Sequence, residues 1–218
     1  MTTSDARAPL CLVGMSGVGK SFWAKRLVAA GWTRHDCDGD IAARLSELVE
    51  PAAGEEPVHA LGRWMGMPYA PGYDEREAQY VALEEEVTAR AVDAAVGAPG
   101  RHVVDCTGSV VYLSEQLLRR LTSGTRVVYL ATPEARTHAM LARYLEEPKP
   151  VVWGGAYVRR DGEDERAALS RSYGELLRVR DARYRALADV VLDGGELERA
   201  DPGLDGFLAR CGLAAGAR

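Results

Sequence analysis

Gly14-Met15-Ser16-Gly17-Val18-Gly19-Lys20-Ser21 is the stretch that decides the fold of this 218-residue chain. It matches G-x-x-x-x-G-K-[ST], the pattern of loops that bind phosphate groups. Its glycines let the backbone curl tightly, so that its N–H groups point inward at phosphate oxygens. In such a loop the lysine, here Lys20, reaches the β- and γ-phosphates, and the hydroxyl, here Ser21, can ligate Mg²⁺. The segment therefore predicts a nucleotide-binding site.

The residues on both sides of the loop support this prediction. Leu10-Cys11-Leu12-Val13 is an apolar run typical of a buried parallel strand. Residues 20–30 suit a helix that Gly31 closes. A helix that begins at the loop directs its positive end at the same anion. The predicted nucleotide contacts are the loop itself and the residue after it, Phe22.

Composition predicts one soluble domain. The chain has 218 residues, 47% of them hydrophobic, and a net charge of −5, which disfavours nucleic acid as the main partner. No apolar run approaches a membrane span, and the N-terminus lacks a signal-peptide pattern, so we expect a cytoplasmic protein without a membrane partner. The four cysteines are scattered, which predicts reduced, mostly buried thiols and neither disulfides nor a zinc site.

Strands and helices are predicted to alternate along the chain. Further strands are expected at 35–38, 101–106, 125–131 and 189–192, with helices between them. This order predicts a five-stranded parallel sheet with helices on both faces, in a single domain over residues 1–218. Within that domain we expect a substrate-binding insert at about 51–80, irregular as far as residue 73, and a lid at about 146–162.

Acidic residues follow two of these strands, at the sheet edge where ligands of parallel sheets bind. Asp36 and Asp38 are two residues apart on a predicted strand, so both side chains are expected on the same side of it. One carboxylate can hold Mg²⁺ through water, while the other accepts a proton from a substrate hydroxyl. The alternative is that Asp38 or Asp40 caps the next helix and Asp36 lies in solvent. Asp105 supports Mg²⁺ in one interpretation and makes a strand-end hydrogen bond in the other.

Other polar residues are candidates for substrate contacts. Thr107 and Gly108 follow the strand of Asp105 and offer a hydroxyl and backbone N–H groups near the substrate. Lys149 lies between two prolines in the expected lid, a position that suits a residue closing over phosphates. Positive charge at such a site matters because phosphoryl transfer depends on positioning and charge neutralisation.

From residue 9 to about residue 193 the chain resembles shikimate kinases, which belong to the nucleoside-monophosphate-kinase-like group of phosphate-loop folds. The loop followed by F-W-A-K-R-L, the segment Asp36-x-Asp38-x-x-Ile41 and the stretch Arg180-Asp181-Ala182-Arg183-Tyr184 resemble family motifs. Lys149-Pro150-Val151-Val152 resembles the lid motif R-P-L-L, with lysine in place of arginine.

The resemblance implies a role for each matching residue. Asp36 would organise Mg²⁺, and Asp38 would bind the substrate hydroxyls. Arg143 would lie near the adenine, and Arg180 would contact the substrate carboxylate. Lys149 would take the place of the catalytic arginine of the lid.

The chain also departs from the family pattern. Cys106-Thr107-Gly108 stands where the family has three glycines. Val81 stands where the family has the carboxylate-binding arginine of its F-R-x-x-E motif. Arg76, one helical turn earlier, is a candidate to replace that arginine.

The sequence therefore predicts ATP- and Mg²⁺-dependent phosphoryl transfer to a hydroxyl of a small metabolite, either shikimate or a cyclitol-like polyol. Asp38 would act as the base, and Lys20 and Lys149 would neutralise charge. Two alternatives remain open: a nucleotide-binding regulatory protein without transfer activity, and a nucleotide kinase. A nucleotide kinase needs several arginines around the acceptor phosphate, for which Arg76, Arg159, Arg160 and Arg180 are candidates. The identity of the acceptor and the oligomeric state are left open.

Overall fold

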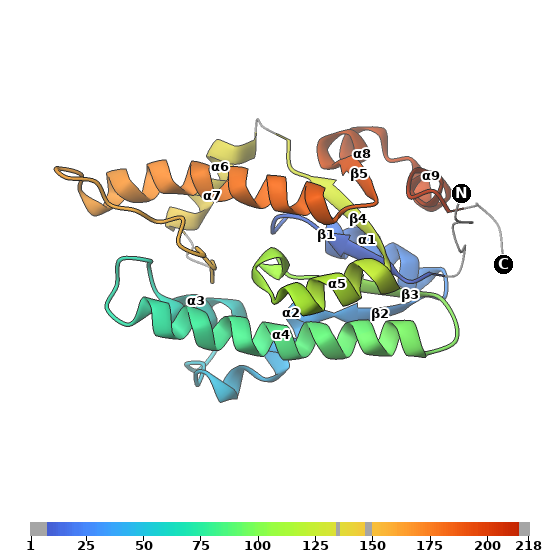
Figure 1. The fold of residues 1–218 in the computed structure, drawn as a ribbon, viewed down its shortest axis with the longest axis horizontal. Coiled ribbons are helices and arrows are strands. Elements are labelled where there is room, and N and C mark those ends of the chain that lie inside the picture. The colour runs from blue at the N-terminus through green and yellow to red at the C-terminus, as the bar shows by residue number, and fades with distance from the viewer. Residues whose placement is uncertain (1–7, 134–135, 147–149, 214–218) are drawn as a thin grey trace.

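The structure, a computed structural model, describes residues 8–133, 136–146 and 150–213. These residues form a parallel five-stranded sheet in the order β2-β3-β1-β4-β5 (Figure 1). The strands are β1 (Leu10–Val13), β2 (Thr33–Asp36), β3 (His102–Asp105), β4 (Arg126–Ala131) and β5 (Val190–Asp193). This architecture confirms the predicted fold class.

Alternate side chains of the central strands enter two separate cores, as the pleat of a strand requires. Leu10 and Leu12 of β1 pack with α1 (Lys20–Ala29), α8 (Gly194–Ala200) and α9 (Gly203–Arg210) on one face. Cys11 and Val13 point to the other face. There they meet α4 (Tyr73–Gly97), α5 (Glu115–Gly124) and α7 (Glu165–Leu187). Both faces of the sheet are thus covered, and the loops at its carboxyl edge are free to build a site.

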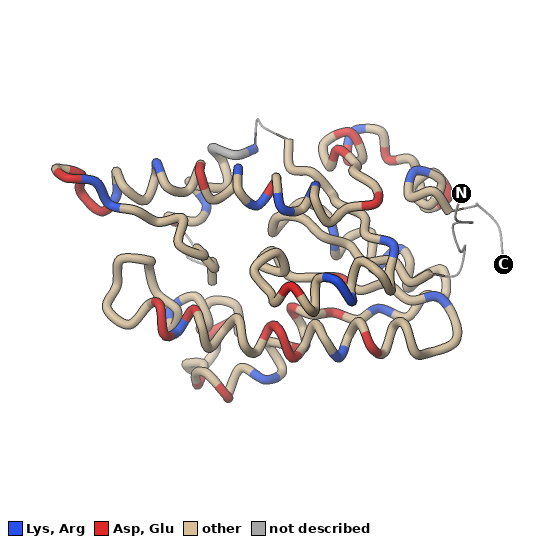
Figure 2. The backbone as a smooth tube through the Cα atoms, viewed as in Figure 1, with Lys and Arg blue, Asp and Glu red and all other residues tan. Residues whose placement is uncertain are grey.

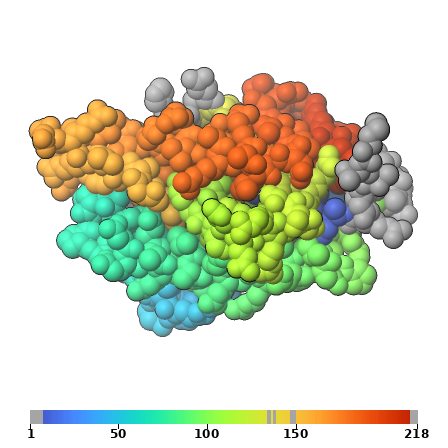
Figure 3. Space-filling model, in the orientation of Figure 1, coloured from blue at the N-terminus to red at the C-terminus, as the bar shows by residue number. Residues whose placement is uncertain are grey.

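The shorter elements gather around that edge. They are α2 (Cys37–Ala43), α3 (Pro57–Met65), α6 (Thr137–Glu146) and two short 3₁₀ turns, η1 (Leu45–Glu47) and η2 (Val110–Tyr112). The described residues 150–162, here called the lid segment, connect α6 to α7 and contain no helix or strand. In the space-filling view the lid segment meets the start of α4 at one end of the molecule (Figure 3). Tyr69 and Tyr157, with ring centroids 6.0 Å apart, are part of this contact.

The second strand ends earlier than predicted. β2 stops at Asp36, and Asp38 lies in the first turn of α2, so the expectation that both side chains lie on one side of a strand is wrong. Asp36, with its extended backbone, is the N-cap of α2, and its carboxylate accepts a hydrogen bond of 3.2 Å from Gly39 N. The alternative interpretation, in which Asp38 or Asp40 caps this helix, is also wrong.

The region 51–73 is less irregular than predicted, because α3 lies within it. Pro57 occupies the first turn of α3, where a missing N–H costs nothing, and Gly66 ends the helix with a positive φ of 73°. The helix buries Ala60, Leu61 and Met65 in the core beside α4. Pro57 and Gly66 thus mark the two ends of α3.

Charged residues of both signs are interspersed along α4 and α7 (Figure 2). Arg90–Glu86 on α4 and Arg185–Asp181 on α7 are ion pairs one helical turn apart. All four cysteines are free and buried, as predicted. Among the described residues, no helix combines the length and the apolarity needed to cross a membrane.

Gly14 is the glycine on which the phosphate loop most depends. Its φ is +143°, and an added Cβ would lie 2.6 Å from the Leu130 carbonyl oxygen of β4. We expect Gly14→Ala to lower the free energy of unfolding by about 2 kcal/mol or more, because backbone strain and overpacking add. The measurement is urea unfolding followed by circular dichroism.

Gly174 on the exposed side of α7 provides the matched control, since an added Cβ would meet nothing within 4 Å. Gly174→Ala should raise the free energy of unfolding by roughly 0.5–1 kcal/mol, because alanine favours the helical backbone. Equal unfolding midpoints for the two variants would contradict this account of the loop.

Candidate active site

The phosphate loop holds its lysine inside the protein. Lys20 is buried, and its Nζ donates hydrogen bonds to Gly14 O at 2.8 Å and Met15 O at 3.1 Å. Burial lowers the pKa of Lys20, while Asp38 and Asp105 nearby oppose this shift. The N-cap of α1 is Gly19, and neither a side-chain cap nor an acidic residue occupies its first turn. The N–H groups of that turn are thus free to bind an anion in the loop.

Arg34 of β2 holds two of the predicted acidic residues. Its Nη1 lies 2.7 Å from Asp36 Oδ2, and its Nη2 lies 2.5 Å from Asp105 Oδ2. Asp36 has both oxygens occupied, because Oδ1 also caps α2. Asp105 Oδ1 is buried and has no hydrogen-bond partner in the described part of the chain. Asp105 therefore keeps a free carboxylate oxygen beside Lys20.

These observations bear on the predicted magnesium ligands Ser21, Asp36 and Asp105. Mg²⁺ prefers oxygen ligands and usually keeps several waters, so a carboxylate beside a phosphate site suits it. The unpartnered Oδ1 of Asp105 fits this requirement. Asp36 fits it less well, because capping and the ion pair with Arg34 already satisfy both of its oxygens. The oxygen atoms of these side chains are thus compatible with Mg²⁺ binding, and Asp105 suits the ion better than Asp36 does.

A cavity of about 340 Å³ adjoins the loop. Met15, Ser16 and Gly17 line one side of it, and Asp38 lines it from α2. Asp38 is exposed, and this exposed surface adjoins the cavity. Partial desolvation raises the pKa of Asp38, while Lys20 opposes the shift. A carboxylate and the phosphate loop thus line the same cavity.

A buried carboxylate, Glu84 of α4, organises the cavity wall. Thr107 and Ser109 both line the cavity and donate their hydroxyl protons to Glu84, the second at 2.6 Å. Glu84 is fully buried, and this burial raises its pKa to about 7. Gly108 between the two donors lies against the loop, where an added Cβ would be 3.4 Å from Ser16 N.

Arg180 of α7 brings a cation to the same cavity. It is buried, its Nη2 donates to Val152 O at 2.6 Å, and its guanidinium lies 5.3 Å from the ring centroid of Tyr112. Its Nε has no hydrogen-bond partner among the described residues. A buried guanidinium whose N–H donors are not all used can bind one anionic group.

The start of α4 anchors the lid segment. The Tyr73 hydroxyl lies 2.6 Å from both Glu77 Oε1 and Val151 O. Glu77 Oε1 also accepts hydrogen bonds from the backbone N–H groups of Trp153 and Gly154, the latter at 3.1 Å. Trp153 is almost completely buried. The lid segment is therefore fixed at the point where it leaves the cavity.

The structure places the remaining predicted residues as follows. Arg143 lines the cavity beside the loop, where an added Cβ on Gly17 would lie 3.9 Å from its Nη1. Phe22 is exposed, with Arg26 Cζ 4.6 Å from its ring centroid. Lys149 lies outside the described residues.

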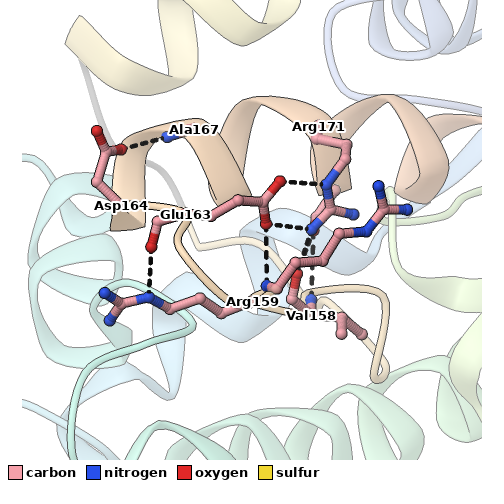
Figure 4. A network of polar contacts seen from close by, with 8 residues as sticks. Val158, Arg159, Glu163, Asp164, Ala167 and Arg171 are labelled. Carbon is pink, nitrogen blue, oxygen red and sulfur yellow. Dashed lines mark hydrogen bonds and ion pairs between the residues drawn. The ribbon is translucent and has the colours of Figure 1, made fainter.

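Arg76 does not line the cavity, because its guanidinium donates to Met65 O and Pro71 O, both at 3.0 Å. Arg159 and Arg160 do not line it either. Figure 4 shows Arg159 donating to the Glu163 carbonyl at 2.8 Å, in a network that includes Arg171. Of the four arginines proposed for an acceptor phosphate, only Arg180 lines the described cavity.

Solved structures with a similar fold include shikimate kinases. The enzyme from Acinetobacter baumannii, in complex with shikimate, matches with a TM-score of 0.55 and 18% identity over 89% of this chain and 90% of that one. The enzyme from Bacteroides thetaiotaomicron matches with a TM-score of 0.54 and 15% identity over 94% of each chain. The chain has the shikimate kinase fold. No protein-family model and no curated protein matches the sequence.

Three polar residues of this site were absent from the sequence prediction. Arg34 stands on an otherwise ordinary edge strand, and Glu77 and Glu84 stand on a helix rich in charge. A sequence signal existed for Glu84 alone, since the apolar residues Tyr80, Leu83 and Val87 lie within one helical turn of it and share its buried face.

Glu84 should make stability depend on pH. Its pKa is raised from 4.5 to about 7, so the folded state favours the protonated carboxyl. The stabilisation is complete below pH 4.5 and is lost as the pH rises past 7. Relative to Glu84→Gln, we expect the wild-type chain to lose up to about 3 kcal/mol of unfolding free energy between pH 5 and pH 8. Parallel pH profiles of the two proteins in urea unfolding would contradict this expectation.

Glu77 should control the exposure of the lid segment. In Glu77→Gln a neutral amide replaces a carboxylate that accepts several hydrogen bonds, at a cost of about 1–2 kcal/mol. We expect amide hydrogen exchange at Trp153 and Gly154 to accelerate about tenfold, because local opening becomes easier. The control is Glu75→Gln, at an exposed position on the same helix. Unchanged exchange in Glu77→Gln, or equal acceleration in both variants, would argue against this anchor.

Proposed function

We propose that the chain is a kinase that transfers the γ-phosphoryl group of ATP, with Mg²⁺, to a hydroxyl of a small metabolite. The observation that carries the proposal is the cavity that the phosphate loop shares with Asp38 and Arg180. It is lined by the phosphate loop on one side and by Asp38 and Arg180 on the other. The fold shared with shikimate kinases supports the same class of reaction but leaves the acceptor open.

In this proposal the acceptor hydroxyl lies beside Asp38. Its oxygen attacks the γ-phosphorus, the bond to the bridging oxygen of ADP breaks, and Asp38 takes the hydroxyl proton. The raised pKa of Asp38 suits a group that accepts a proton. Lys20 balances the negative charge of the transferred group.

The other groups have supporting roles. The backbone of residues 14–21 cradles the phosphates, Arg143 and Phe22 flank the nucleotide, and Lys149 of the lid adds a second cation. Ser21 would ligate Mg²⁺, with Asp105 and Asp36 behind it. When bound, Mg²⁺ neutralises charge on the outer phosphates. The anchored lid segment excludes water, which would otherwise compete with the acceptor hydroxyl.

Two alternatives are less well supported. A nucleotide kinase requires several arginines at the acceptor end, and Arg76, Arg159 and Arg160 are held elsewhere by backbone or acidic partners. A regulatory protein without transfer activity has no need of a carboxylate such as Asp38 opposite the phosphate loop. The measurement below separates this second alternative from the kinase.

The test is ADP release from MgATP with and without alcohols, beginning with shikimate and a set of cyclitols. We expect Lys20→Ala to abolish turnover and Asp38→Asn to reduce kcat by at least about 100-fold, the usual contribution of a general base. Asp40→Asn is the matched control, because Asp40 lies on the same helix but does not line the cavity. A fully active Lys20→Ala variant would refute the proposal. ATP binding without transfer to any alcohol would favour the regulatory alternative.

A further inference from the structure

Arg34 has no role in the proposed reaction, although it contacts two of the residues considered for the magnesium site. It lies two residues before Asp36 on β2, so both side chains emerge on the same face of that strand. Asp36 and Asp105 are register partners on the neighbouring strands β2 and β3. Like charges at such a spacing repel each other. The strand register therefore creates a pair of carboxylates that Arg34 is placed to neutralise.

The guanidinium of Arg34 contacts both carboxylates, but in different ways. Its Nη1 lies 2.7 Å from Asp36 Oδ2, and Asp36 Oδ1 accepts from Gly39 N, so both oxygens of Asp36 are in use. Its Nη2 and Nε donate to a single oxygen of Asp105, Oδ2, at 2.5 Å and 3.2 Å. The other oxygen, Oδ1, is buried and has no hydrogen-bond partner among the described residues. Arg34 thus occupies Asp36 and fixes Asp105 by one oxygen.

The ion pair between Arg34 and Asp105 is shielded from solvent. The exposed fraction of the side chain is 17% for Arg34 and 3% for Asp105. Charges in such surroundings are weakly screened, and a buried carboxylate that loses its cation is strongly disfavoured. The ammonium of Lys20, which is also close, donates to backbone carbonyls of the phosphate loop. A divalent cation would therefore have to displace Arg34 to bind both strand-end carboxylates.

We propose that Arg34 is a positioning residue for the metal of the nucleotide complex, which withholds Asp36 and leaves Oδ1 of Asp105 as the one strand-end carboxylate oxygen for the ion. The inference rests on the proposed function and deepens it, because it assigns the supporting carboxylate of the magnesium site to Asp105. Mg²⁺ held by so few carboxylates completes its ligand shell with phosphate oxygens and waters. The ion therefore binds together with the nucleotide and only weakly before it.

Binding of Mn²⁺ without nucleotide tests the proposal on the full chain. Mn²⁺ takes the same oxygen ligands as Mg²⁺, and its free form is measured directly by electron paramagnetic resonance. Arg34→Met removes the charge and releases both carboxylates, so it should bind Mn²⁺ at least about tenfold more tightly than the wild type. Loss of a purely structural ion pair would not tighten cation binding. Adding Asp105→Asn to Arg34→Met should return the affinity to within about threefold of the wild-type value.

Arg44, the C-cap residue of α2, provides the matched control. Its side chain is 22% exposed, and it also pairs with two carboxylates, those of Glu47 and Glu86. These carboxylates are 51% and 58% exposed, so they stay hydrated once they are released. Arg44→Met should therefore leave the affinity for Mn²⁺ unchanged.

Arg34→Lys keeps the test decisive if Arg34→Met does not fold. One ammonium cannot bridge both carboxylates as the fork of a guanidinium does, so Arg34→Lys should bind Mn²⁺ at least about threefold more tightly than the wild type. Equal or weaker binding in the folded Arg34 variants, an equal gain in Arg44→Met, or a gain that survives Asp105→Asn would overturn the inference. Since the test needs no turnover, a gain confined to the Arg34 variants without phosphoryl transfer to any alcohol would count against the proposed function alone.

Discussion

The buried ammonium of Lys20 is the constraint on which the rest of the site depends. A charge removed from water is expensive unless opposite charges lie close to it. Asp38 and Asp105 supply those charges, and Arg34 in turn balances Asp105. The strand order makes this possible, because β3 lies between β1 and β2 and all three strands end at the same edge. The parallel strand order thus brings the phosphate loop and its acidic partners together at one edge of the sheet.

Arg180 links that edge to the lid segment. Its Nη2 donates a hydrogen bond to the Val152 carbonyl, while its Nε is buried and has no hydrogen-bond partner among the described residues. Glu77 and Tyr73 fix the same stretch from the opposite side through Trp153 and Val151. An anion that binds Arg180 would therefore meet a guanidinium whose position depends on the lid being in place. In the proposed function, recognition of the acceptor and enclosure of the site would therefore share one side chain.

The sequence predicted the nucleotide half of the molecule better than the acceptor half, for a physical reason. A phosphate loop is local: eight consecutive residues define its backbone, and the flanking strand and helix follow from their own apolar patterns. The acceptor half depends on contacts between distant segments, such as Glu84 with Thr107 and Ser109. Spacing along the chain carries little information about such contacts. The end of β2 was predicted wrongly for a different, local reason: Asp36 caps α2 through Gly39 N, which ends the strand two residues early.

The structure connects two departures from the shikimate kinase pattern, Val81 and Thr107, because both positions bear on the buried Glu84. Valine at position 81 removes the arginine expected one turn before Glu84, and none of the ion pairs among the described residues involves Glu84. A buried carboxylate without a cation must be satisfied by hydrogen bonds or bind a proton. The hydroxyl of Thr107, where the family pattern has glycine, provides one of those hydrogen bonds, and Ser109 provides the other. In this chain Thr107 and Ser109 thus supply hydrogen-bond partners for a buried carboxyl group that has no cation paired with it in the described part of the structure.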